Sequence, residues 1–137
     1  MPSPWLAVAD ENLHVGRLLR RHYSRSSICR SYYAVYAACS GWLERKQVPC
    51  GVTRDGTPRD NYAHDQLVRL LREKMMWDER RWPRQDVDAL ANAIRRLQLA
   101  RTNADYDPLA APTADAVQNA VRDAELVLTA LRADLEP

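Results

Sequence analysis

Apolar residues recur at intervals of three and four along five stretches of this chain, which is the spacing of one face of an α-helix. The clearest stretch covers residues 85–105, and another covers residues 26–46. All eight prolines lie outside the strongly periodic stretches. Because helix interiors exclude proline, these residues mark the connections between helices. The other predicted helices cover residues 5–23, residues 61–76 and the segment after Thr113.

Two of the predicted helices carry continuous apolar stripes. In the segment 26–46 the stripe consists of Ile28, Tyr32, Val35, Cys39 and Leu43. In the segment 85–105 it consists of Val87, Leu90, Ile94 and Leu97. The next position of this second stripe is Arg101. Because an unpaired buried charge is costly, a guanidinium at this position requires a partner. Arg101 is therefore expected to be structural, functional or both.

The connections between the stretches complete the prediction of the fold. Residues 47–60 contain two prolines and two glycines and are predicted to form a loop. Thr113 suits the N-cap of the last helix, where Asp115 lies in the first turn and complements the helix dipole. No stretch favours a β-strand. We predict an all-α protein, an antiparallel bundle of four to five helices that forms one domain over residues 1–137.

Charge is distributed unevenly along the 137 residues, although the net charge is only +2. Residues 17–30 hold five arginines and no acidic residue, whereas two arginines and seven acidic residues follow Arg101. Such a basic segment indicates an anionic partner, and a solvated helix face is the alternative. We predict salt-sensitive RNA binding through the five arginines of this segment, which are Arg17, Arg20, Arg21, Arg25 and Arg30.

The cysteines and the N-terminal segment indicate the compartment. Three cysteines, an odd number without the spacing of metal ligands, favour a reducing environment. The first residues lack the basic and apolar regions of a signal peptide, and no apolar run approaches the length of a membrane span. We therefore expect a cytoplasmic protein without a membrane partner, a metal or a cofactor.

Three sequence motifs occur in a recognisable order. Residues 29–34 read Cys-Arg-Ser-Tyr-Tyr-Ala, His64 lies near the start of a middle helix, and residues 101–107 read Arg-Thr-Asn-Ala-Asp-Tyr-Asp. Over roughly residues 10–135 the chain resembles the HEPN superfamily (higher eukaryotes and prokaryotes nucleotide-binding domain). More narrowly, it resembles a small bacterial and archaeal branch that is often encoded beside a minimal nucleotidyltransferase. The resemblance implies a HEPN-like bundle that forms a homodimer.

The resemblance also implies a chemistry. Many HEPN proteins are metal-independent ribonucleases, in which an arginine holds a phosphate through its fork and a histidine four to six residues later transfers protons. In this chain Arg101 is followed by the polar Thr102, but no histidine occurs after His64, and Tyr106 stands five residues after Arg101. We predict a site of Arg101, Asp105 and Tyr106. In it Asp105, one helical turn later, orients the guanidinium and Tyr106 donates a hydrogen bond.

Alternatives remain for the individual residues. Arg101 is equally well explained as a structural residue that bridges carboxylates inside the bundle. His64 is assigned a structural or capping role. Three tyrosines of the segment 26–46 are interpreted as core residues or as anchors of a homodimer interface, with a nucleotide-stacking role as the alternative. These tyrosines are Tyr32, Tyr33 and Tyr36.

Two functions remain open at this point. The first is a toxin-like or defence-associated HEPN-domain protein that binds RNA or nucleotides, with a metal-independent endoribonuclease activity that is weak or lost without the motif histidine. The second is a non-catalytic helical dimer that acts as partner or scaffold for a nucleotidyltransferase antitoxin or another effector. The missing histidine favours the second function, and the resemblance favours the first.

Overall fold

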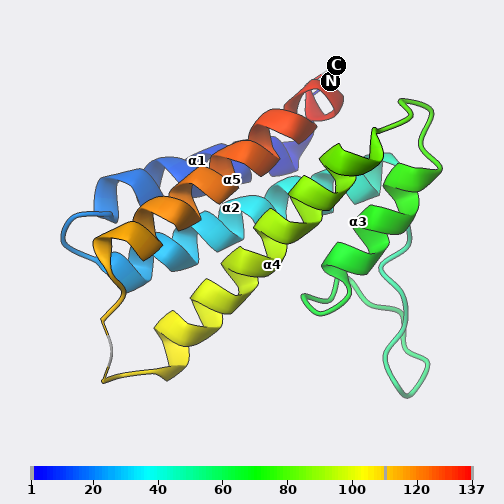
Figure 1. Ribbon diagram of the computed structural model, residues 1–137. Coiled ribbons are helices and arrows are strands. Elements are labelled where there is room, and N and C mark those ends of the chain that lie inside the picture. The colour runs from blue at the N-terminus through cyan, green and yellow to red at the C-terminus, as the bar shows by residue number, and fades with distance from the viewer. Residues whose placement is uncertain (1, 110, 137) are drawn as a thin grey trace.

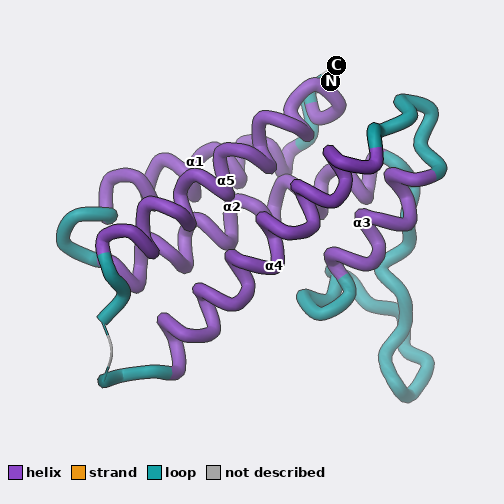
Figure 2. Tube along the Cα trace, in the orientation of Figure 1, coloured by secondary structure: helices purple, strands orange, loops and turns teal. Residues whose placement is uncertain are grey.

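The computed structural model describes residues 2–109 and 111–136, and these residues form five helices without a strand (Figures 1 and 2). Val52 and Pro58 form an isolated β-bridge within a loop. The predicted all-α helical bundle is therefore confirmed. The helices are α1 (Pro4–Leu19), α2 (Ser24–Arg45), α3 (Leu67–Met76), α4 (Arg84–Tyr106) and α5 (Ala114–Leu135).

Helix α2 is the centre of the bundle and packs against each of the other four helices. Thirteen of its 22 residues are buried, so it is covered on almost all sides. Helices α1 and α4 run in one direction and α2 and α5 in the opposite direction (Figure 1). The apolar stripes predicted for α2 and α4 point into one common core, which Arg101 borders at the end of its stripe.

The largest difference from the prediction is the start of α3, which begins at Leu67 rather than near residue 61. The preceding segment is held by side-chain contacts instead of helical hydrogen bonds. Tyr62 is buried, its backbone oxygen accepts a hydrogen bond from the Tyr36 hydroxyl at 2.6 Å, and its own hydroxyl donates to the Val48 backbone oxygen. Residues 46–66 consequently form one long connection (Figure 2).

The other helix ends agree more closely with the sequence. Helix α1 ends at Leu19, four residues before its predicted end, because residues 20–23 form the turn into α2. Thr113 is the N-cap of α5, and its side chain accepts a hydrogen bond from the Ala116 amide at 3.1 Å. No helix in the part of the chain that the structure describes combines the length and apolar character that crossing a membrane requires.

Gly41 marks the tightest contact among α1, α2 and α5. A Cβ atom added there would lie 2.7 Å from Trp5 Cβ and 2.9 Å from Ser3 Oγ. In an open helix, alanine stabilises by about 1 kcal/mol relative to glycine. Overpacking a close contact costs about 1–3 kcal/mol. We therefore expect Gly41→Ala to lower the free energy of unfolding measured by urea denaturation.

A matched control reports helix propensity alone. Asn92 is exposed on α4, and Asn92→Ala introduces alanine without a close contact. Equal stabilisation by Gly41→Ala and Asn92→Ala would contradict the close packing of α1 and α2 at Gly41.

Candidate functional site

Arg101 lies near the C-terminal end of α4, where its stripe leaves the core. Its side chain is 27% exposed, and its guanidinium carbon lies 5.1 Å from the ring centre of Tyr32 and 5.3 Å from that of Tyr33. The Tyr33 hydroxyl accepts a hydrogen bond from Nη2 at 3.4 Å. Two aromatic rings of α2 therefore support the arginine, as cation–π geometry favours.

Asp105 pairs with Arg101 as the helical spacing predicts. Its Oδ2 lies 3.4 Å from Arg101 Nε, an ion pair that lacks hydrogen-bond geometry, so the buried Nε donor has no hydrogen-bond partner in residues 2–109 and 111–136. A guanidinium has five N–H donors, and within those residues Tyr33 accepts the one hydrogen bond that Arg101 makes. Arg101 is thus oriented but keeps donors for an anion.

His64 reaches the same tyrosines from the connection before α3. Its Nδ1 lies 2.5 Å from the Tyr32 hydroxyl oxygen, and its ring stacks on Tyr36 with 4.4 Å between the ring centres. The Gln98 side chain donates to the His64 backbone oxygen at 2.9 Å. Because Gln98 lies one turn before Arg101, α4 holds both the arginine and the loop that carries the histidine. We call Tyr32, Tyr33, His64, Arg101 and Asp105 the Arg101–His64 site.

The environment of this site keeps its histidine neutral. Partial burial lowers the pKa of His64, and the positive charge of Arg101 lowers it further, against a smaller effect of Asp65. Burial raises the pKa of Tyr32 to about 12, so its hydroxyl stays protonated and can donate or accept a hydrogen bond. At neutral pH the site therefore combines a fixed cation with an uncharged imidazole, a pair suited to holding an anion and accepting a proton.

Cys29 makes a second contact with the Asp105 carboxylate. Its Sγ lies 3.1 Å from Asp105 Oδ1. Burial, followed by the hydrogen bond to Asp105, raises the pKa of Cys29 to about 11. The thiol is therefore a protonated donor and not a nucleophile. Asp105 is held between Cys29 and Arg101, which makes it a positioning residue.

Tyr106 was predicted to lie beside Arg101 as a hydrogen-bond donor, but its side chain lies outside the Arg101–His64 site. Its side chain is 78% exposed, and within the described part of the chain it makes no hydrogen bond or ring contact with the site. Five residues correspond to a rotation of about 140° around a helix, so Tyr106 points away from the face of Arg101. His64 instead contacts Tyr32, the residue on which the Arg101 guanidinium also lies. The signal for it in the sequence was its position in the family resemblance, which gave no distance to Arg101.

The three tyrosines predicted at an interface have different surroundings. Tyr32 has no exposed surface and lies in the core, one of the two positions predicted for these tyrosines. Tyr33 is 39% exposed, and Tyr36 is half-buried. Only Tyr33 and Tyr36 therefore have surface with which to contact another molecule.

The five arginines predicted to bind RNA also differ in their contacts. Arg25 donates to the backbone oxygens of Ala104 and Asp107 at 2.5 and 2.8 Å and thereby holds the end of α4 against α2. Arg17 forms an ion pair with Glu125 at 3.1 Å, although its side chain is 47% exposed. Helical periodicity does not reveal these contacts, because the partners of Arg25 and of Arg17 lie far away in the sequence.

The remaining members of that set have more open surroundings. Arg30 is exposed and donates to the Asn12 side chain at 3.2 Å. Arg20 and Arg21 make no hydrogen bond or ion pair with residues 2–109 or 111–136 through their side chains. These two arginines remain free for an anion.

No protein-family model and no curated protein matches this chain. In residues 2–109 and 111–136, no three side chains of His, Cys, Asp or Glu are grouped closely enough to hold a metal ion.

The electrostatic contact across this site predicts a measurable shift. We expect Arg101→Gln to raise the pKa of His64, because the substitution removes a positive charge that disfavours the imidazolium. NMR titration of the imidazole protons measures this pKa, and His14 and His22 serve as internal references in the same spectra. An unchanged or lower pKa of His64 in the variant would contradict the proximity of the two side chains.

Proposed function

We propose that this protein is a HEPN-like, metal-independent endoribonuclease in which Arg101 binds a phosphate of RNA and His64 transfers protons. The observation that carries the proposal is the shared tyrosine support, since Tyr32 contacts both the Arg101 guanidinium and the His64 imidazole. In place of the motif histidine four to six residues after the arginine, His64 comes from the connection before α3. The function therefore does not require a histidine in α4.

The proposed reaction is attack of a ribose 2′-hydroxyl on the adjacent phosphate. His64 accepts the proton of the 2′-hydroxyl, a bond forms between O2′ and phosphorus, and the bond from phosphorus to O5′ breaks. The leaving oxygen takes a proton from the imidazolium or from water, and the product carries a cyclic phosphate. Arg101 donates to the non-bridging oxygens, where negative charge increases in the transition state.

Tyr32 selects the tautomer of His64 in this scheme. When the Tyr32 oxygen accepts a hydrogen bond from Nδ1–H, the lone pair on Nε2 is left to act as the base. The raised pKa of Tyr32 keeps its hydroxyl neutral, so it does not compete for the proton that His64 accepts. Tyr32 is therefore a positioning residue in the proposal.

The resemblance to HEPN proteins supports a biological setting for this activity. A toxin-like or defence-associated ribonuclease in the cytoplasm, controlled by a nucleotidyltransferase antitoxin, fits the motifs at residues 29–34 and 101–107. A homodimer that brings two Arg101–His64 sites to one cleft fits the exposed Tyr33 beside the arginine.

Substitutions at the two central residues test the proposal in an RNA-cleavage assay. We expect His64→Ala to lower kcat by about 10²–10⁴-fold, the usual contribution of general acid–base catalysis. Arg101→Ala is expected to lower activity more than Arg101→Lys, because lysine keeps the charge but loses the fork. Circular dichroism verifies that the variants remain folded.

Tyr106→Phe is the matched control, because Tyr106 lies close to Arg101 in the sequence but outside the site. We expect this variant to cleave RNA at the wild-type rate. Full cleavage by folded Arg101→Ala and His64→Ala variants would show that the site is structural and would overturn the proposal.

A second candidate function has its own observation. Met76 and Trp77 lie side by side at the end of α3 and are 69% and 82% exposed. Large exposed apolar side chains of this kind anchor protein interfaces, so the protein is alternatively a non-catalytic partner of a nucleotidyltransferase. Wild-type protein that cleaves no RNA, and that loses a co-expressed nucleotidyltransferase through Trp77→Ser, would favour this second function.

A further inference from the structure

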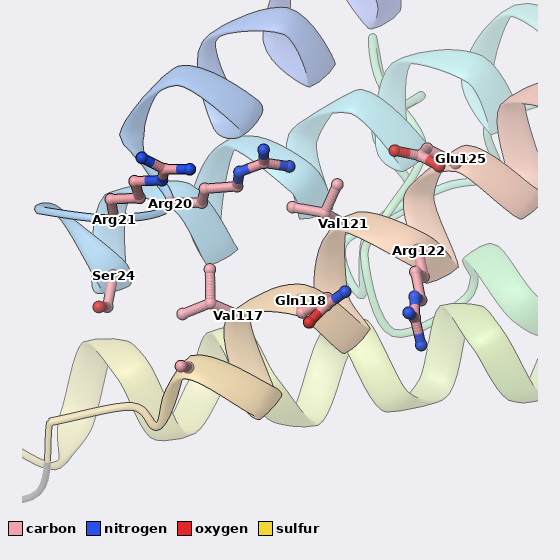
Figure 3. A pocket seen from close by; sticks show the side chains of 9 residues that line it. Arg20, Arg21, Ser24, Val117, Gln118, Val121, Arg122 and Glu125 are labelled. Carbon is pink, nitrogen blue, oxygen red and sulfur yellow. The ribbon is translucent and has the colours of Figure 1, made fainter.

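A surface cavity of about 630 Å³ lies between the end of α1, the start of α2 and the first half of α5. Arg20 and Arg21 line it from the turn after α1, and Arg122 lines it from α5. Figure 3 shows Val117 and Val121 on α5 beside Arg20, with Arg122 farther along α5 and its side chain directed away from Arg20 and Arg21. We call the cavity lined by these five residues the arginine groove. Its volume is within the usual range for the binding of a small ligand.

The charges of the arginine groove are not neutralised within the described part of the chain. Arg20, Arg21 and Arg122 make no hydrogen bond or ion pair there through their side chains. Glu125, the acidic residue among those lining the cavity, is paired with Arg17 at 3.1 Å. Arg20 and Arg21 bring two like charges to one side of the cavity, and an anion in the groove would reduce their mutual repulsion.

The start of α2 adds to the positive potential of the groove. Ser24, the first residue of this helix, lines the cavity, and no side chain caps the first turn. The free amide groups and the dipole at a helix N-terminus favour a negative charge. The guanidinium groups supply N–H donors, from which phosphate oxygens accept hydrogen bonds.

We infer that the arginine groove binds phosphate groups of single-stranded RNA as a second site, separate from the Arg101–His64 site. The inference rests on the proposed function for its substrate and explains how a flanking part of that substrate is held. Along α2, Tyr32 lies eight residues beyond Ser24, an axial rise of about 12 Å. The groove therefore sets affinity, and the Arg101–His64 site carries out cleavage.

The test is a triple variant, Arg20→Gln, Arg21→Gln and Arg122→Gln, in full-length protein. Fluorescence anisotropy measures the Kd of a labelled single-stranded RNA at several salt concentrations. We expect the triple variant to bind at least 10-fold more weakly at low salt. If three phosphate contacts are lost, the slope of log K against log salt should become shallower by about two.

A second triple variant, Arg54→Gln, Arg59→Gln and Arg84→Gln, removes the same net charge from exposed positions elsewhere. We expect it to retain most of the RNA affinity. Equal losses in the two triple variants, or none in the groove variant, would overturn the inference.

The melting temperature of the free groove variant should not fall, because the substitutions remove repulsion. A fall of several degrees would show that the arginines are structural and would also count against the groove.

Kinetics separate the inference from the proposed function. The groove variant is expected to raise KM for RNA cleavage with kcat unchanged, whereas Arg101→Ala is expected to lower kcat. If Arg101→Ala leaves cleavage intact while the groove variant loses RNA binding, the proposed ribonuclease site fails and the groove stands. If kcat falls in the groove variant, the groove belongs to the chemistry and is not a separate site.

Discussion

The hydrogen bond between the buried Tyr32 hydroxyl and His64 is the interaction on which the candidate site depends. Tyr32 has no exposed surface, and a buried hydroxyl without a partner is costly. His64 satisfies it at 2.5 Å, and the long connection before α3 is thereby fixed to α2. On the same tyrosine the Arg101 guanidinium rests at 5.1 Å. One core residue therefore brings together two side chains that are remote in the sequence.

The surrounding contacts make this arrangement rigid without filling it. Gln98 contacts the His64 backbone, Tyr36 contacts the face of its ring, and Asp105 lies beside Arg101 Nε. N–H donors of Arg101 therefore remain available for an anion. Because the supporting groups stand on α2 and α4, which pack against each other in the core, the site is held by helices rather than by loops alone.

The sequence predicted the features that depend on local periodicity. The stripes of α2 and α4, the cap at Thr113 and the pairing of Arg101 with Asp105 all follow from the spacing of residues along a helix. The late start of α3 was not predictable in this way, because Tyr62 is held by contacts with Val48 and Tyr36. Such contacts exist only once the connection has folded against the bundle.

The same reason explains which site residues were missed. His64 lies in a connection, where periodicity says nothing about its neighbours. Arg25 stood out as a basic residue, but its partners are backbone oxygens at the end of α4, a contact without a signature in the sequence. Arg122 lies in an acidic segment, and only the packing of α5 beside the α1–α2 turn places it at the same cavity as Arg20.

The central claim, that Arg101 and His64 form one binding site, can be tested directly by NMR. A short single-stranded RNA with a 2′-deoxy nucleotide at the cleavage position cannot undergo attack by the 2′-hydroxyl and serves as the probe. We expect the His64 imidazole and the Arg101 Nε–H signals to shift together, with the same Kd, during the titration. A shift of one signal without the other, or with a clearly different Kd, would contradict the claim.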